Sequence, residues 1–244
     1  MTAIADSRER RKVSPVVVKI GGSLISGKRL QGIVATIARA RRPVVVVPGG
    51  GGFADEVRHV QAHHDVSDRA AHTMAILAMH QMGVMLQDMQ VRFVAVETLA
   101  EIRQALAANR IPVWLPLRLS VADTKIPADW SVTSDGLAAR LAERLRLQAV
   151  YLVKSRCVID GPSAAELAAD GIVDRTFADV VERARLSFRI FGPGEEADLA
   201  RACLASPVAP HPSALRRTGG RAERARRGAR RLAAGTGNMP SPRG

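Results

Sequence analysis

The stretches VVVKIGGSLI, at residues 16–25, and PVVVVPGGGGF, at residues 43–53, each run from an apolar segment into a cluster of glycines. Uninterrupted runs of β-branched residues are typical of strands that are buried on both faces of a parallel sheet. Glycines at the carboxyl end of such a strand let backbone N–H groups approach an anion closely. The two stretches therefore predict a parallel α/β fold with a phosphate site at one edge of its sheet.

Strand-like and helix-like segments alternate along the chain, which is the pattern of a parallel sheet covered by helices. The expected strands are residues 16–20, 44–47, 91–96, 111–115, 149–153 and 188–191. The expected helices are residues 27–41, 53–63, 66–89, 98–108, 134–145, 177–185 and 195–204. The fold class that we predict is a three-layer αβα sandwich with a mainly parallel central sheet.

The chain has 244 residues, 47% of them apolar, which is enough for one large α/β domain. We expect a flexible N-terminus at residues 1–14, this domain at residues 15–209 and a disordered basic tail at residues 210–244. The tail holds nine arginines and one glutamate, a large part of the formal net charge of +13. It has no aromatic residue for base stacking, so we expect weak adhesion to polyanions and no specific nucleic-acid partner.

Composition also argues against membrane and metal-binding classes. No run of about 18 apolar residues occurs, and no apolar signal-peptide core follows the N-terminal segment, so we expect a cytoplasmic protein without a membrane partner. Cys157 and Cys203 lie far apart, outside any zinc or disulfide spacing. Five histidines of the central region lack an HExxH pattern, so no metal site is predicted among them: His59, His63, His64, His72 and His80.

Two lysines fall at strand ends. Lys19 interrupts an apolar strand one residue before its end, and Lys154 closes the run YLVK. A buried ammonium is costly unless an anion compensates it, and a nucleotide phosphate would do so. The alternatives are a side chain that reaches solvent or one that pairs with a local carboxylate.

Two further segments suit an anion site. Four glycines stand between a valine run and an amphipathic helix, where an anion cradle is favoured over a flexible linker: Gly49, Gly50, Gly51 and Gly52. Neither a Walker motif nor GxGxxG is present. In the segment TSDGLAARLA, Asp135 either caps a helix or, between two phosphate-binding lysines, keeps both charged and oriented.

Four blocks, KIGGSL, PGGGGFADEVR, TSDGLAARLA and LVKSRCVIDGP, occur in this order. Together they resemble the amino acid kinase superfamily, which includes acetylglutamate, aspartate, uridylate and isopentenyl phosphate kinases. The resemblance covers residues 16–203. It implies a phosphotransferase that uses ATP with Mg²⁺ in an in-line transfer to a small-molecule substrate, and it implies a homo-oligomer.

The resemblance also implies a role for each block. The catalytic residues would be Lys19, Asp135 and Lys154. The nucleotide-binding residues would be Lys19, Gly21, Gly22, Ser23, Lys154, Asp160 and Gly161. The acceptor-binding residues would be Gly49, Gly50, Gly51 and Gly52. Many members of the superfamily carry a later lysine at the γ-phosphate, which this chain lacks between residues 170 and 185, so Arg175 or Arg183 would have to replace it.

The sequence defines the phosphoryl acceptor less closely than the nucleotide site. A Met-rich segment, the stretches IPVWLP and IPADW, and TSDGLAARLA look most like the small kinases of the methanofuran pathway, which phosphorylate (5-(aminomethyl)furan-3-yl)methyl phosphate. An amino acid, uridylate or isopentenyl phosphate kinase, a catalytically silent nucleotide-binding regulator and a polyanion-binding accessory protein are the alternatives. The methionines either line an acceptor pocket or, as is more typical of helical spacing, belong to the core or a dimer face. A closing strand that the family pattern would place after Leu204 is missing from the sequence.

Overall fold

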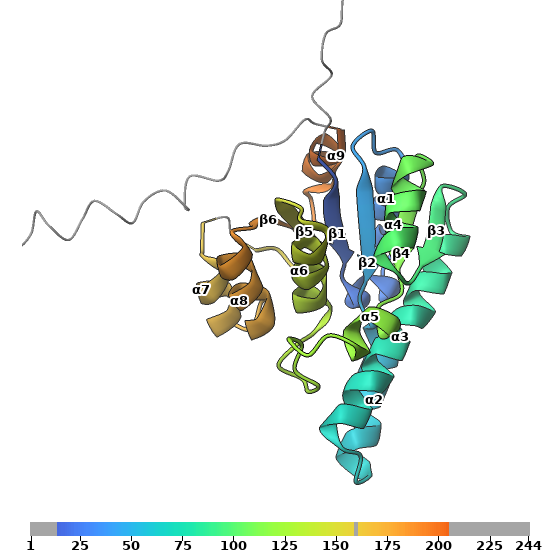
Figure 1. The fold of residues 1–244 in the computed structure, drawn as a ribbon. Helices are drawn as coiled ribbons and strands as arrows, with labels where there is room; N and C mark the ends of the chain where they lie inside the picture. The colour runs from blue at the N-terminus through green and yellow to red at the C-terminus, as the bar shows by residue number, and fades with distance from the viewer. Residues whose placement is uncertain (1–13, 159–160, 205–244) are drawn as a thin grey trace, which may run out of the picture. The chain divides into compact units, whose positions relative to one another are not determined.

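Figure 1 shows a computed structural model of the protein, which describes residues 14–158 and 161–204. Within these residues, six strands form one sheet in the order β3-β4-β2-β1-β5-β6, and every neighbouring pair is parallel. The strands are β1 (Val16–Ile20), β2 (Val44–Pro48), β3 (Phe93–Val96), β4 (Ile111–Trp114), β5 (Ala149–Val153) and β6 (Ser187–Phe191). The predicted α/β class with a parallel central sheet is confirmed.

Helices alternate with the strands, as predicted. They are η1 (Gly22–Ser26), α1 (Arg29–Ala38), α2 (Gly51–His63), α3 (Asp68–Asp88), α4 (Leu99–Ala107), α5 (Leu117–Val121), α6 (Ser134–Leu145), α7 (Ala164–Ala169), α8 (Arg175–Ala184) and α9 (Glu196–Leu204).

Different helices cover the two faces of the sheet (Figure 1). Val17, with other residues of its face, belongs to a buried cluster that includes apolar side chains of α4, α6 and α8. Val16, Val18 and Ile20 belong to a second cluster, built with α1 and α9. Because successive side chains of a strand point to opposite faces, Lys19 shares the face of Val17 and α6.

The central strands β1, β2 and β5 are buried along their whole length, as expected for strands covered on both faces. Lys19 is 6% exposed and is charged, in contrast to its neighbours in β1. An ammonium in such a place requires a compensating charge. The sheet therefore positions Lys19 where only a specific partner keeps it stable.

The short elements were not predicted. The helices η1, α5 and α7 span five or six residues each, too few for a helical period to show in the sequence. A local signal did exist for α7, because Ser163 and Glu166 form a capping box at its start. The predicted helix at residues 66–89 begins two residues later, since the Ser67 side chain accepts a hydrogen bond from the Ala70 amide and caps α3.

The methionines of α3 serve mainly the core, in line with the more typical of the two readings. Met82 is fully buried, and Met85 and Met89 pack against the apolar cluster beneath α1. Met79 is buried as well but also lines the cavity described below. The core placement is thus confirmed for these methionines, and a role of Met79 in an acceptor pocket stays a prediction.

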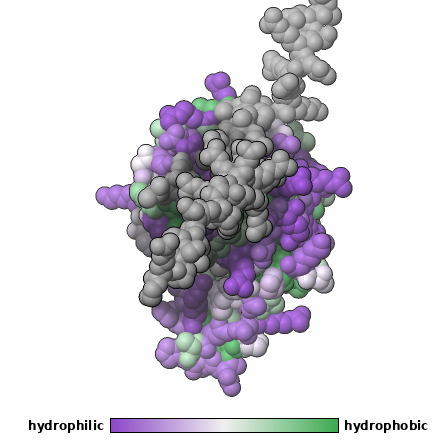
Figure 2. Space-filling view, turned by 90° about the vertical axis from the view of Figure 1, so that its left-hand side faces the viewer, coloured by the Kyte–Doolittle hydropathy of each residue, from purple (hydrophilic) through white to green (hydrophobic). Residues whose placement is uncertain are grey.

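One face of the described part is largely polar where its residues are coloured (Figure 2). On the face shown in Figure 2, hydrophilic residues predominate among those that are coloured. Across residues 14–158 and 161–204, none of the helices combines the length and the apolarity that a membrane crossing needs. The N-terminus, the residues after Leu204 and Asp160 lie outside the described residues, so what the sequence predicts for them stays a prediction.

Candidate functional site

Three buried charged side chains meet at the carboxyl edge of the sheet. The Nζ atom of Lys19, in β1, lies 2.9 Å from Oδ1 of Asp135, and Nζ of Lys154 lies 2.6 Å from Oδ2 of the same carboxylate. Lys154 directly follows β5, the neighbour of β1, and Asp135 stands in the first turn of α6. The side chains of Lys19, Asp135 and Lys154 are only 7%, 5% and 13% exposed. The fold thus brings together all three residues assigned to catalysis.

The charges of this trio do not balance, because two ammonium groups share one carboxylate. Burial alone would raise the pKa of Asp135, but attraction by Lys19 and Lys154 outweighs it and holds that pKa below its usual value. Burial lowers the pKa of Lys154, although Asp135 opposes this effect. The site carries a buried positive excess, which is suited to a bound anion.

Lys154 is fixed by more than its carboxylate partner. Its Nζ also donates to the carbonyl oxygen of Ile172. Its own carbonyl accepts a hydrogen bond of 3.1 Å from Arg29, and Arg29 also donates to Gly192 and pairs with Glu196. Arg29 therefore ties the ends of β5 and β6 to α9 and keeps the backbone of Lys154 in place.

Two arginines are the candidate replacements for the later family lysine, Arg175 and Arg183. Arg183, one of the two arginines considered for the later family lysine, instead pairs with Glu143 at 2.9 Å, on the outer side of α6. That pair holds its guanidinium away from the trio, and the replacement of the later lysine stays a prediction. Arg175, the other arginine considered, is exposed at the start of α8.

The glycine loops after β1 and β2 pack backbone against backbone. A Cβ atom at Gly22 would lie 2.1 Å from the amide nitrogen of Gly51, and one at Gly49 would lie 2.4 Å from the amide nitrogen of Gly22. Gly51 also has a φ of 58°, which disfavours any side chain. Gly52 differs, because a Cβ there would meet open space. The close approach thus involves the first glycines of the run and not the last.

A cavity of about 260 Å³ opens beside the two loops. Its inner end is formed by Gly22, Ser23, Gly50, Gly51, Thr133 and Ser134. Its walls are Ala54, Ala75, Ile76, Met79, Val132 and Leu137. Its remaining lining residues, which are polar or aromatic, are Asp55, Arg58, His72 and Trp130. The inner end lies at the N-terminus of α2, where no side chain caps the first amides and the helix dipole favours an anion, and beside the capped N-terminus of α6.

The N-terminus of α6 is held by a partly buried carboxylate, Asp174, that sequence reasoning missed. One oxygen of Asp174 accepts hydrogen bonds from the amide and hydroxyl of Thr133, at 2.9 and 2.6 Å, and from the amide of Gly136 at 2.8 Å. The other oxygen accepts from the amide of Phe177 and caps α8. Burial raises the pKa of Asp174, and the nearby charge of Asp135 adds to the rise. Asp174 therefore fixes the helix turn that carries Asp135.

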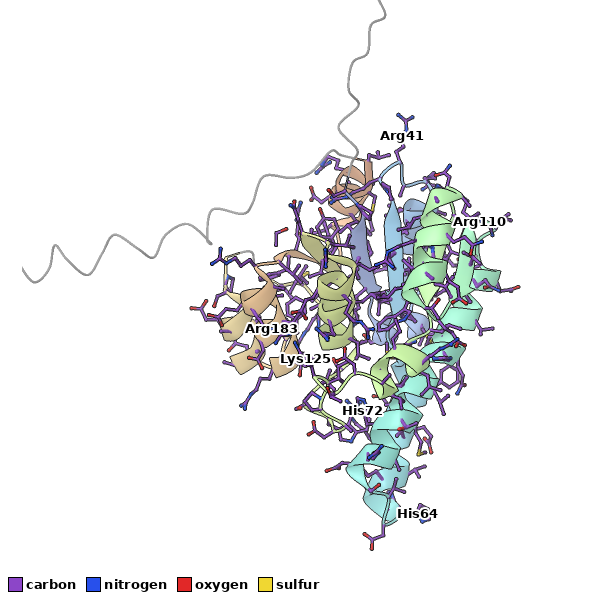
Figure 3. The ribbon with its side chains drawn as sticks, in the orientation of Figure 1. Arg41, His64, His72, Arg110, Lys125 and Arg183 are labelled. Carbon is purple, nitrogen blue, oxygen red and sulfur yellow. The ribbon has the colours of Figure 1, made fainter. Side chains whose placement is uncertain are left out.

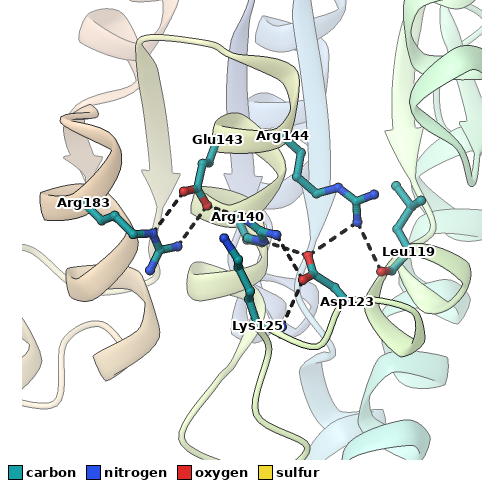
Figure 4. A network of polar contacts seen from close by, with 7 residues as sticks. All are labelled: Leu119, Asp123, Lys125, Arg140, Glu143, Arg144 and Arg183. Carbon is teal, nitrogen blue, oxygen red and sulfur yellow. Dashed lines mark hydrogen bonds and ion pairs between the residues drawn. The ribbon is translucent and has the colours of Figure 1, made fainter.

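An ion network on the outer side of α6 anchors the loop that leads into it (Figure 4). Asp123 pairs with Arg140 at 2.7 Å, and Arg140 pairs with Glu143 at 2.5 Å. Hydrogen bonds from Arg183 and Arg140 lower the pKa of Glu143 to about 2. The network joins the loop, the middle and end of α6, and α8, so it holds the body of α6 in place while Asp174 holds its N-terminus.

The remaining predicted residues are placed as follows. Ser23 lies at the same edge, with its hydroxyl 2.8 Å from that of Ser155. The amide of Gly21 donates to the carbonyl of Val153 at 2.8 Å. Gly161 is exposed and has a φ of 129°. The structure does not bring Gly161 into the trio, and its role stays a prediction.

The histidines lie in different environments. His64 stands at the far end of the α2–α3 hairpin, whereas His72 lies between α3 and the loop before α6 (Figure 3). Burial lowers the pKa of His72, although Asp129 opposes this effect. Among the described side chains, no group of three or more His, Cys, Asp or Glu residues is placed to hold a metal ion.

Comparison with known proteins identifies the family. The sequence matches the model of the amino acid kinase family over residues 14–156, which contain the glycine loops and all three residues of the trio. The chain belongs to the amino acid kinase family. The family and the class of enzyme predicted from the four sequence blocks are confirmed, and the trio lies within the matched region.

Individual relatives are more distant. The chain is 28% identical over 138 residues to [5-(aminomethyl)furan-3-yl]methyl phosphate kinase of Methanocaldococcus jannaschii, a match that covers 56% of this chain and 63% of that protein. Uridylate kinase of Archaeoglobus fulgidus has a similar structure, with a TM-score of 0.58 and 16% identity over 78% of this chain and 95% of that one. Carbamate kinase of Giardia lamblia, bound to AMP-PNP, has a TM-score of 0.52 and 12% identity over 82% and 99%. These two structures share the fold.

Proposed function

We propose that this amino acid kinase family member transfers the γ-phosphoryl group of ATP to a small phosphomonoester, with [5-(aminomethyl)furan-3-yl]methyl phosphate as the first candidate acceptor. The observation that carries the proposal is the pairing of two buried lysines with one carboxylate, beside two glycine loops that touch through their backbones. A positive excess and a backbone cradle at one sheet edge are what a polyphosphate requires.

The donor side of the site is supported by charge and shape. Lys19 and Lys154 would neutralise the β- and γ-phosphates, and Asp135 would keep both ammonium groups charged and correctly placed. A related fold was solved with AMP-PNP, which is an analogue of ATP. Magnesium would arrive on the nucleotide, held by phosphate oxygens and water.

The residues of the site suit an in-line transfer between two bound anions. The uncapped amides at the N-terminus of α2 would orient the acceptor, while Lys19 and Lys154 would stabilise charge on the transferred group. Asp174 would not touch the substrates; it would be a positioning residue, because it holds the helix turn that carries Asp135. Positioning and charge neutralisation would supply most of the acceleration, and no covalent enzyme intermediate is needed.

The acceptor is inferred from the relative and from the cavity. The kinase of Methanocaldococcus jannaschii is named for a furan phosphate, and this chain matches 63% of its length. The cavity of about 260 Å³ has room for roughly nine water molecules, the size of a small metabolite. Its inner end favours an anion and its walls are apolar, which suits a phosphate attached to a small ring.

The test is a panel of acceptors with ADP release as the readout. We expect release with the furan phosphate and much less with uridine monophosphate, carbamate or aspartate. The Lys19→Ala variant should lose turnover by at least about 100-fold, whereas Lys125→Ala, which changes an exposed lysine, should retain it.

Two results would contradict the proposal. Turnover with carboxylate acceptors alone would refute the phosphomonoester assignment. Binding of ATP without turnover of any acceptor would favour the catalytically silent regulator instead.

A further inference from the structure

One end of the cavity is formed by a cation held between a carboxylate and an aromatic face. Asp55 and Arg58 lie on α2, and Trp130 lies in the loop before α6; all three line the cavity. The guanidinium carbon of Arg58 lies 4.1 Å from the centroid of the Trp130 ring, and its Nη1 donates to Asp55 at 3.2 Å. A carboxylate beside an aromatic face is a standard binding site for an organic cation. Here the site is filled by a side chain of the protein itself.

The occupant of this site is weakly held. The side chains of Arg58 and Asp55 are 48% and 69% exposed. An ion pair at that exposure contributes less than about 1 kcal/mol, and an exposed cation–π contact contributes a similar amount. The Arg58 side chain can therefore move away from Asp55 and Trp130 with a small loss of free energy.

The aromatic wall, in contrast, is fixed. Nε1 of Trp130 donates to Gln61 at 2.6 Å, and Gln61 in turn donates to Asp68 at 2.8 Å. These bonds tie the ring to the α2–α3 hairpin without involving Arg58. When Arg58 moves, the face of Trp130 thus stays where it is, and Asp55 loses its partner on the same helix.

The two ends of the cavity have opposite preferences. The uncapped N-terminus of α2 at the inner end favours an anion, whereas Asp55 and Trp130 favour a cation. The walls between them, such as Ile76 and Leu137, are apolar. A molecule that matches this order carries a phosphate, then a compact apolar ring, then an ammonium group.

We propose that Asp55 and Trp130 recognise a primary ammonium group of the acceptor, and that Arg58 occupies their site only while the acceptor is absent. The inference rests on the proposed function for the choice of acceptor class, an amine-bearing phosphomonoester. The opposite possibility, that Arg58 itself binds an anionic group of the acceptor, predicts opposite effects of the same substitutions.

Furfurylamine is a direct probe, since it carries a ring and an ammonium group but no phosphate. Its binding is followed by tryptophan fluorescence, because the chain has two tryptophans and the other, Trp114, is buried in β4 and gives a constant background. Furfuryl alcohol, of nearly the same shape but uncharged, is the ligand control. We expect saturable binding of the amine and none of the alcohol.

Two substitutions should change the affinity for furfurylamine in opposite directions, and only this arrangement predicts both. Asp55→Asn should weaken furfurylamine binding about fivefold, because it removes the carboxylate. Arg58→Gln should strengthen it about fivefold, because the competing cation is gone while most of the stem remains. Glu56→Gln, which alters a carboxylate of similar exposure outside the cavity lining, should change nothing.

The inference is overturned if the amine does not bind, if the alcohol binds equally well, or if Arg58→Gln weakens binding. It is also overturned if Asp55→Asn and Glu56→Gln behave alike. Because this assay needs no phosphoryl transfer, its outcome is separate from the proposed function. If the substitutions change furfurylamine affinity in the predicted directions but the furan phosphate is not turned over, the cation site is supported and only the proposed activity is refuted.

Discussion

Replacing Gly22 by alanine tests whether the contact between the two glycine loops is required for turnover. The added Cβ atom would lie 2.1 Å from the amide nitrogen of Gly51 and 2.6 Å from its Cα, and both are backbone atoms. To reach an ordinary contact of 3.4 Å, the loops must separate by about 1.3 Å. The amide nitrogen of Gly50 lies 3.1 Å from the same position, so a small sideways shift of the new methyl group does not relieve the clash.

A displacement of this size affects activity more than stability. Overpacking of a tight contact typically costs about 1 to 3 kcal/mol of unfolding free energy. A misplacement of about 1 Å between reacting groups lowers the rate roughly 100-fold. Steady-state ADP release should therefore show a fall in kcat/KM of about 100-fold for Gly22→Ala, with circular dichroism still that of a folded protein.

The matched control is Gly32→Ala, in the exposed face of α1, where a Cβ atom has no neighbour within 4 Å. Alanine in a helix is more favourable than glycine by about 0.5 to 1 kcal/mol, so this variant should be slightly more stable and equally active. A folded Gly22→Ala enzyme with kcat/KM within about threefold of the parent would refute the role given to the loop contact.

Three further substitutions probe the supports of the site. Asp135→Asn leaves two buried ammonium groups without a counter-charge, so urea titration at pH 7 should show a loss of about 3 to 5 kcal/mol; an unchanged midpoint would contradict the buried trio. In the parent protein both oxygens of Asp174 accept hydrogen bonds from N–H groups. Asp174→Asn replaces one of these oxygens by an NH₂ donor, and should lower the unfolding free energy by about 2 kcal/mol in the same titration. Glu143→Gln should cost about 1 kcal/mol at pH 7. Because the folded-state pKa of Glu143 is depressed from 4.5 to about 2, its stabilisation is complete above pH 4.5 and is lost as the pH falls toward 2, so titrations at pH 7 and pH 3 should show the difference between variant and parent shrinking; a constant difference would argue against the ion pairs.

Much of the fold was predictable because the signals were local and strong. The valine runs of β1 and β2 and the alternation of strand and helix specify a parallel sheet, and the predicted strand 16–20 and helix 134–145 have the observed bounds. Boundaries shifted where a cap decides them, as at Ser67 before α3. The short helices α5 and α7 have too few residues for a period to emerge.

The site was predictable only in part. Lys19 stood out as a charge in a buried strand, and Lys154 repeated its position at the end of another. That both reach the carboxylate of Asp135 depends on the adjacency of β1 and β5, which are far apart in the sequence. The same holds for Asp174, which acts on residues about forty positions away. Nothing in the order of residues 55–58 and Trp130 indicated that they would share a cavity wall.

The central claim is that Lys19 and Lys154 bind the same polyphosphate. Calorimetric titration with AMP-PNP and magnesium tests this claim most directly. The account predicts that the parent protein and Lys125→Ala bind alike, and that Lys19→Ala and Lys154→Ala, while folded, each bind at least about tenfold more weakly. Equal affinity in either site variant, or no binding by the parent, would contradict it.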